Sequence, residues 1–123
     1  MINLKKILVL LILLLVGCDS GTYKQISASK AHDMIDKNEV VILDVRETYE
    51  YETGHLKDAI NIPFDELEDR FIQEVTDNKS EKIIIYCQSG SRAQIAAETL
   101  VALDFKNVYT FGGIDSWNYE IEK

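Results

Sequence analysis

A cysteine at the end of an apolar run has the surroundings of a nucleophile. Cys87 follows the run at residues 83–86, and the residues after it are Gln88, Ser89, Gly90, Ser91 and Arg92. If a helix begins near Arg92, the backbone N–H groups of this loop can point inward, bind anions and stabilise a thiolate. We therefore expect Cys87 to be an exposed catalytic nucleophile and residues 88–92 to bind its substrate. The alternative is a buried cysteine that packs as a small hydrophobe.

Short apolar runs predict the strands that position this loop. Residues 40–43 and 83–86 are rich in β-branched side chains, which is typical of strands buried on both faces of a parallel sheet. Ligands of such sheets bind beyond the carboxyl ends of the strands, where Cys87 lies. A last strand is expected over residues 107–110.

Apolar residues at helical spacing predict the elements that cover the sheet. Strands that alternate with helices indicate an α/β domain. The predicted elements are a helix beginning near Ala28 with Ser27 as its N-cap, helices over 65–75 and 93–103, a turn at Gly112 and Gly113, and a short helix over 115–121 anchored by Trp117.

The first residues have the layout of a secretory signal. Lys5 and Lys6 precede an apolar run over residues 7–16, which is well short of the roughly 20 residues that span a bilayer. Residues 15–18, LVGC, resemble the lipobox of bacterial lipoproteins. The resemblance implies cleavage before Cys18 and lipid attached to it. An uncleaved signal anchor is the alternative.

This interpretation divides the chain into a lipoprotein signal peptide at 1–17, a lipidated tether at 18–23 and a folded domain at 24–123. Several acyl chains anchor a protein far more firmly than one. We therefore expect lipid on Cys18 to hold the domain at the extracytoplasmic face of the bacterial cell membrane.

The net charge and the number of cysteines limit which partners the domain can have. The chain has 13 basic and 21 acidic residues, and loss of Lys5 and Lys6 with the signal peptide leaves 11 basic residues against 21 acidic ones. Nucleic acid is a poor partner for such a domain. Lipid on Cys18 leaves Cys87 without a cysteine to pair with, so we expect a free thiol.

Three segments resemble the motifs of rhodanese-like domains, in the order of that family. Residues 43–63 contain L-D-V-R, E-Y, G-H and A-x-N-I-P, residues 87–92 match C-x-x-G-x-R, and residues 112–117 match G-G-x-x-x-W. The resemblance implies a single rhodanese-like domain with a roughly five-stranded parallel sheet flanked by helices. The chain departs from the family at Asp58, where glycine is usual and where aspartate tolerates left-handed backbone. It also lacks the Gly-x-Pro that follows the tryptophan.

The resemblance further implies sulfur transfer by covalent catalysis. The thiolate of Cys87 takes a sulfane sulfur from a small anionic donor such as thiosulfate, holds it as a persulfide and passes it to cyanide or a thiol. A protein acceptor is also possible. Two successive displacements predict ping-pong kinetics, and the resemblance implies neither a cofactor nor a metal.

The other candidate residues have supporting roles. We expect Arg92 to close the loop by holding carbonyls or acids and to help bind an anionic donor. We interpret Asp44 and Arg46, which end a strand on the same side of the sheet, as a scaffold pair first and as site residues second. The resemblance makes His55 structural, and Trp117 is expected in the core.

Three other functions stay open. Phosphatases and arsenate reductases of related folds hold a tetrahedral oxyanion with a cysteine, an amide cradle and an arginine, but usually have five residues between cysteine and arginine, whereas this chain has four. A non-catalytic rhodanese module that binds a partner is the second, and loss of the cysteine would be its clearest sign. A thiol sensor or persulfide carrier that serves a protein acceptor at the membrane is the third.

Overall fold

Five parallel strands form the sheet that carries the loop. The computed structural model describes residues 21–37 and 39–123, so the predicted signal peptide and Cys18 lie outside the described residues. The strand order is β1-β6-β5-β2-β4, and every neighbouring pair is parallel. The strands are β1 (Lys24–Gln25), β2 (Val41–Asp44), β4 (Ile60–Asn61), β5 (Lys82–Cys87) and β6 (Asn107–Gly113).

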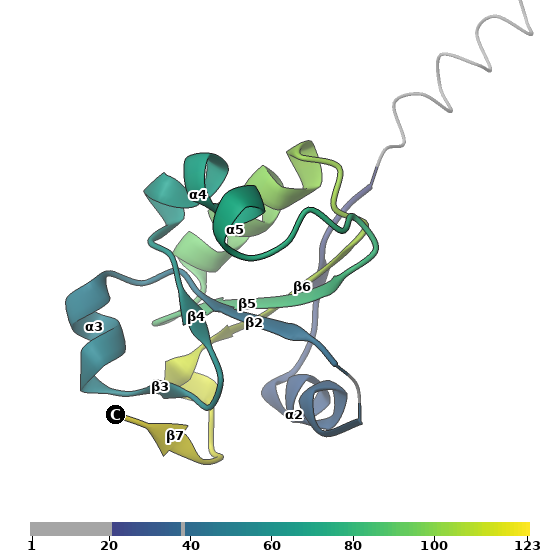
Figure 1. Cartoon of the computed structure of the whole chain (residues 1–123). Helices are drawn as coiled ribbons and strands as arrows, with labels where there is room; N and C mark the ends of the chain where they lie inside the picture. Colours follow the sequence, from purple (N-terminus) through teal and green to yellow (C-terminus); the bar gives the residue numbers. More distant parts are fainter. Residues whose placement is uncertain (1–20, 38) are drawn as a thin grey trace, which may run out of the picture.

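Helices cover both faces of this sheet, as Figure 1 shows. α2 (Ala28–Lys37) lies on one face, and α4 (Leu67–Glu74) and α5 (Ser91–Ala102) lie on the other. α3 (Thr48–Thr53) follows β2 and therefore lies at the carboxyl ends of the strands. None of the described helices is long and apolar enough to cross a bilayer. The remaining elements are the 3₁₀ turns η1 (Phe64–Glu66) and η2 (Ile114–Ser116) and the antiparallel pair β3 (His55–Leu56) and β7 (Ile121–Glu122).

Successive side chains of β5 contribute to two hydrophobic cores, one on each face of the sheet. Ile83 and Ile85 belong to the core that includes α4 and α5, whereas Ile84 and Tyr86 belong to the core that includes α2. Successive side chains of a strand point to opposite faces, so a sheet covered on both sides requires an unbroken apolar run. The prediction of a single α/β domain with a five-stranded parallel sheet between helices is confirmed.

Two local predictions concern the backbone. The Lys30 N–H donates to Ser27 Oγ at 3.0 Å, so Ser27 satisfies a free amide at the start of α2, as an N-cap does. Asp58 has a φ of 64°, the left-handed conformation that glycine supplies most easily. The aspartate therefore keeps the turn between β3 and β4.

The last part of the chain differs from the prediction. The glycine pair at 112–113 belongs to β6 and does not form a separate turn, and the helix predicted over 115–121 is only the 3₁₀ turn η2. Trp117 already has extended backbone, with a ψ of 115°. The side chains at 118–121 are exposed, so a continued helix would bury little beyond Trp117, and a short helix depends on packing of an apolar face. The chain instead forms β7, which pairs with β3.

Replacement of Phe71 by alanine should destabilise the domain strongly. Phe71 is fully buried and meets Phe105 edge to face, with the ring centroids 5.1 Å apart. Loss of a buried phenylalanine side chain costs about 3–5 kcal/mol. Urea unfolding followed by circular dichroism measures the loss, and Ile72→Ala, at an exposed position of the same helix, should cost less than about 1 kcal/mol. Equal losses in the two variants would contradict this account of the core.

Candidate active site

The sulfur of Cys87 lies where β5 ends and α5 begins. The backbone N–H groups of Gly90 and Ala93 donate to Cys87 Sγ, with N···S distances of 3.0 and 3.4 Å. Sγ also lies 3.9 Å from the carbonyl oxygen of Gly112. Amide donors at the start of a helix stabilise negative charge. The surroundings of the sulfur therefore suit a thiolate or a persulfide anion.

The thiol is more buried than the sequence indicates. Cys87 is 1% exposed and belongs to the core on the α5 face, so the prediction of an exposed sulfur is wrong for this structure. A Cβ placed on Gly90 would lie 3.4 Å from the Cα of Gly112, so these two backbones pack together against the sulfur and cover it. Purely apolar packing is also wrong, because two amides point at Sγ.

Two glycines let the loop fold this tightly. Gly90 is the N-cap of α5 and has a φ of 131°, a conformation that residues with side chains rarely adopt. Gly113 lies opposite the cysteine at a register shift between β5 and β6, and a Cβ there would overlap the carbonyl group of Gln88. Of the predicted pocket residues, Gly90 directs its amide at the sulfur, whereas Ser89 and Ser91 are exposed.

Arg92 holds a carboxylate from another part of the chain. Its Nη1 and Nη2 donate to Glu50 at 2.6 and 3.0 Å. This hydrogen-bonded pair raises the pKa of Arg92 and lowers the pKa of Glu50. Glu50 Oε1 also accepts the backbone N–H of Glu47 at 3.1 Å, which is part of a capping box at the start of α3. The ion pair therefore joins α3 to α5 beside the loop.

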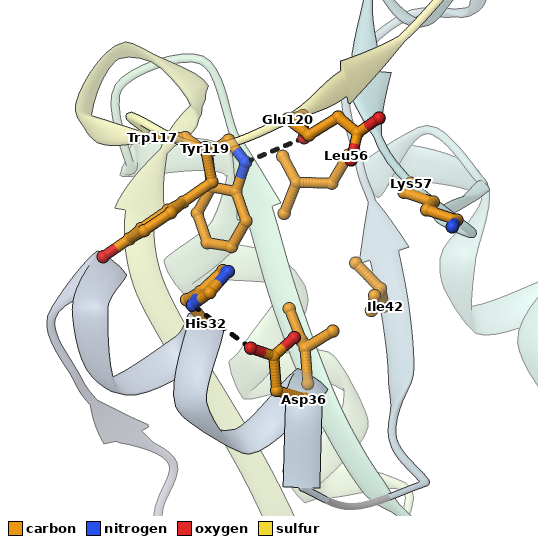
Figure 2. A pocket seen from close by; sticks show the side chains of 9 residues that line it. His32, Asp36, Ile42, Leu56, Lys57, Trp117, Tyr119 and Glu120 are labelled. Carbon is orange, nitrogen blue, oxygen red and sulfur yellow. Dashed lines mark hydrogen bonds and ion pairs between the residues drawn. The ribbon is translucent and has the colours of Figure 1, made fainter.

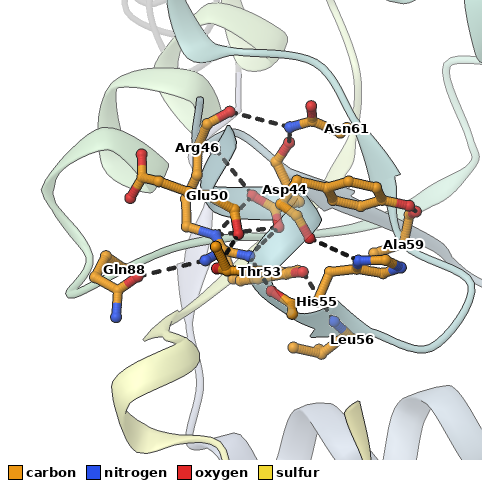
Figure 3. Close-up of polar contacts among 12 residues, drawn as sticks. Asp44, Arg46, Glu50, Thr53, His55, Leu56, Ala59, Asn61 and Gln88 are labelled. Carbon is orange, nitrogen blue, oxygen red and sulfur yellow. Dashed lines mark hydrogen bonds and ion pairs between the residues drawn. The ribbon is translucent and has the colours of Figure 1, made fainter. Parts of the chain in front are cut away.

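Asp44 and Arg46 form a buried ion pair, drawn in Figure 3. Arg46 Nη2 donates to Asp44 Oδ2 at 2.7 Å and to the carbonyl oxygen of Gly54 at 2.6 Å. Arg46 Nη1 donates to Gln88 Oε1 at 3.4 Å. Burial acts against the charged guanidinium, but the hydrogen bond and the charge of Asp44 outweigh it and raise the pKa of Arg46. The pair thus connects the end of β2 with the first residue after the cysteine.

Gln88 also connects the loop to the segment after β6. Its Nε2 donates to Asp115 Oδ1 at 2.5 Å, and the Asp115 N–H donates to the Gln88 carbonyl oxygen at 3.2 Å. The motifs in the sequence indicate neither Asp115 nor Glu50 as a neighbour of the loop. The Glu47-x-x-Glu50 spacing is a capping-box pattern, so it marks the start of a helix but does not reveal the contact with Arg92.

His55, Tyr86 and Trp117 are held in place by contacts with the rest of the fold. His55 is buried, stacks on Tyr51 with the centroids 3.7 Å apart, and has its Nδ1 2.9 Å from the Tyr51 carbonyl oxygen. Tyr86 accepts the N–H of Leu56 at 3.0 Å, and burial raises the pKa of its hydroxyl, which stays neutral. Trp117 packs against the core on the α2 face.

One cavity lies beside the Cys87 loop, and another lies against α2. One of about 250 Å³ adjoins the loop and is lined by Gln25, Ile26, Ser89, Gly90, Gln94, Thr110, Phe111 and Gly112. The other, of about 110 Å³, lies where His32 stacks on Tyr119 near Trp117 (Figure 2), and its lining includes no residue of 87–92. Within the described part of the chain, no three His, Cys, Asp or Glu side chains are grouped so that they could hold a metal ion.

Known proteins with related sequences share the same domain. The family model of the rhodanese-like domain matches residues 27–120. Thiosulfate sulfurtransferase GlpE of Coxiella burnetii is 35% identical over 96 residues, which cover 77% of this chain and 87% of that protein. The tRNA uridine(34) hydroxylase of Photorhabdus laumondii is 33% identical over 97 residues, which cover 76% of this chain but only 28% of the hydroxylase. The chain belongs to the rhodanese-like domain family.

Solved structures agree with this assignment. A rhodanese-related protein from Thermoplasma volcanium superposes with a TM-score of 0.69 at 33% identity, over 81% of this chain and 98% of that one. A rhodanese-like domain protein from Staphylococcus aureus has a TM-score of 0.71 at 30% identity, over 80% of this chain and 96% of that one. The fold around Cys87 is therefore the family fold.

Replacement of Gly113 by alanine should disrupt the loop. The added Cβ would overlap the Gln88 carbonyl, so the β5–α5 turn must shift and the amides of Gly90 and Ala93 must move from the sulfur. We expect a loss of at least about 2 kcal/mol in urea unfolding, as for overpacking at a rigid site, and a slower reaction of Cys87 with sulfur donors. Ser116→Ala, which removes only the 3.0 Å hydrogen bond from Ser116 Oγ to the Gly113 carbonyl, is the matched control. Wild-type stability and reactivity in Gly113→Ala would contradict the close approach of the two strands.

Proposed function

We propose that this protein is a sulfurtransferase in which Cys87 carries sulfur as a persulfide. The thiolate attacks the outer sulfur of a donor such as thiosulfate, an S–S bond forms on Cys87, and the bond to the rest of the donor breaks with its electron pair, so that sulfite leaves. A thiol or cyanide then attacks the outer sulfur of the persulfide and regenerates the thiolate. Covalent catalysis of this kind divides one transfer into two displacements.

The observation that supports this proposal is the pair of amides directed at the sulfur. Gly90 and Ala93 donate to Sγ across 3.0 and 3.4 Å, and donors that are fixed in advance stabilise charge without reorganisation. A relative with 35% identity is named a thiosulfate sulfurtransferase. Its similarity covers most of both chains, which favours the same class of reaction here.

The alternatives receive less support from the site. An oxyanion enzyme of the phosphatase or arsenate reductase type needs its arginine for the substrate, but Arg92 is hydrogen bonded to Glu50 through two nitrogens. A non-catalytic module needs no amides around a thiol. A persulfide carrier that serves a protein acceptor uses the same Cys87 chemistry and differs only in the acceptor.

We also propose that lipid on Cys18 anchors the protein at the extracytoplasmic face of the membrane. The support is the sequence alone: two lysines, a short apolar run and LVGC at 15–18. The folded domain begins with β1 at Lys24, so Cys18 is separated from the domain by only a few residues. The site would therefore work close to the membrane surface.

Incubation of the purified full chain with thiosulfate should add one sulfur atom to Cys87. Intact mass spectrometry should show a gain of about 32 Da, as expected for a covalent persulfide. Cys87→Ser should show no gain, and Cys18→Ser should retain it, since Cys18 takes no part in the transfer. Absence of the adduct with every sulfane donor, together with turnover of an aryl phosphate, would favour the oxyanion enzyme instead.

Replacement of Cys18 by alanine should release or misprocess the protein. The variant lacks the thiol that receives lipid, so it should leave the membrane fraction, or accumulate with its signal peptide, when bacterial cells are fractionated. The mass of the mature wild-type N-terminus should include the lipid. Unchanged membrane attachment of Cys18→Ala would contradict the lipobox.

A further inference from the structure

Both arginines near the Cys87 loop are already paired with carboxylates. Arg46 is buried with Asp44, and Arg92 donates to both oxygens of Glu50. Glu50 is itself fixed, because its Oε1 also accepts the Glu47 N–H in the capping box of α3. An anionic donor that needs Arg92 must therefore displace a carboxylate that the helix holds in place.

Asp115 adds a negative charge beside the loop, and the loop itself supplies no positive charge before Arg92. The residues at 88–91 are uncharged, and Asp115 accepts a hydrogen bond from Gln88 at 2.5 Å. Asp115 takes part in none of the ion pairs within residues 21–37 and 39–123. The ionised side chains joined by these hydrogen bonds are two arginines and three carboxylates, and the charge of Glu47 also acts on Arg92. A dianion such as thiosulfate therefore approaches a site with a small net negative charge.

We propose that Glu50 sets the charge selectivity of the site: by holding Arg92, it directs Cys87 away from dianionic donors and towards sulfane sulfur on carriers of low or positive net charge. This inference rests on the proposed sulfur transfer. Glu50 touches no reacting atom and acts through Arg92, so it is a positioning residue. The carriers that fit are zwitterionic or cationic thiosulfonates and persulfides, small or on a basic protein surface.

Three donors that differ in charge but share the reacting sulfur test this proposal. Thiosulfate is a dianion, methanethiosulfonate a monoanion, and 2-aminoethanethiosulfonate a zwitterion without net charge. In each, the Cys87 thiolate forms a bond to the outer sulfur, and the bond pair of the broken S–S bond leaves with sulfite or a sulfinate. Because intrinsic reactivities differ, the measured quantity is the ratio of kcat/KM between variant and wild type for each donor.

Glu50→Gln is the informative variant, because glutamine keeps an oxygen for the Glu47 amide but loses the charge that holds Arg92. We expect kcat/KM for thiosulfate to rise about tenfold, mainly through a lower KM, as for one unit charge removed several ångströms from a dianion. The zwitterion should change less than twofold. Glu74→Gln, which breaks the exposed Arg70–Glu74 pair of α4, is the matched control and should leave all three ratios near one.

Two further measurements complete the test. The double variant Glu50→Gln/Arg92→Gln should lose the gain with thiosulfate, because the gain depends on a released Arg92. In the wild type, added potassium chloride should raise kcat/KM for thiosulfate by screening like charges and should leave the zwitterion unchanged. If Glu50→Gln does not fold, a fall of the wild-type thiosulfate rate with salt still overturns the charge selectivity.

Equal changes for all three donors in Glu50→Gln, or a fall of the wild-type thiosulfate rate with salt, would overturn the charge selectivity. Those outcomes leave sulfur transfer itself intact, since every donor still gives the Cys87 adduct. Failure of all three donors to form an adduct would instead overturn the proposed function. The two proposals can therefore fail separately.

Discussion

The close approach of β5 and β6 at their carboxyl ends controls the geometry of the site. Gly113 lies opposite Cys87, where a Cβ would overlap the Gln88 carbonyl, and Gly90 takes a φ of 131° as the chain enters α5. With so little room, the loop turns its amides inward, and those of Gly90 and Ala93 face the sulfur. The core below the loop keeps these donors in place, which is why they need no rearrangement when charge develops on sulfur.

The buried pair of Asp44 and Arg46 positions the segments around the loop more than it stabilises the folded domain. Removing Asp44 and Arg46 from water is costly, and a buried ion pair often contributes little net free energy of folding. Here the cost is offset by further hydrogen bonds to Gly54 and Gln88, and the described chain has no buried side-chain nitrogen or oxygen without a partner. These hydrogen bonds hold the end of β2 against the loop and against Gly54, which follows α3.

Much of this arrangement could be predicted from the sequence, because strand and helix periodicity and three motifs are local patterns. The apolar run at 83–86 predicted β5, and the C-x-x-G-x-R motif placed Cys87 at its end. Contacts between distant segments left no such pattern: Glu50 lies 42 residues from Arg92. The exposure of the sulfur was also mispredicted, because the packing of Gly90 on Gly112 depends on the β5–β6 register. The helix expected over 115–121 does not form, because the chain becomes extended at Trp117 and then pairs with β3 as β7.

The central claim is that backbone amides hold a negatively charged sulfur at Cys87. The most direct measurement is a crystal structure of the protein after reaction with a sulfane donor. We predict that the outer sulfur of the persulfide lies within about 3.5 Å of backbone nitrogens in residues 88–93, because hydrogen bonds to an anion are short and the Gly90 and Ala93 nitrogens already lie 3.0 and 3.4 Å from Sγ. An outer sulfur packed among apolar side chains, with the Gly90 and Ala93 amides directed elsewhere, would contradict the claim.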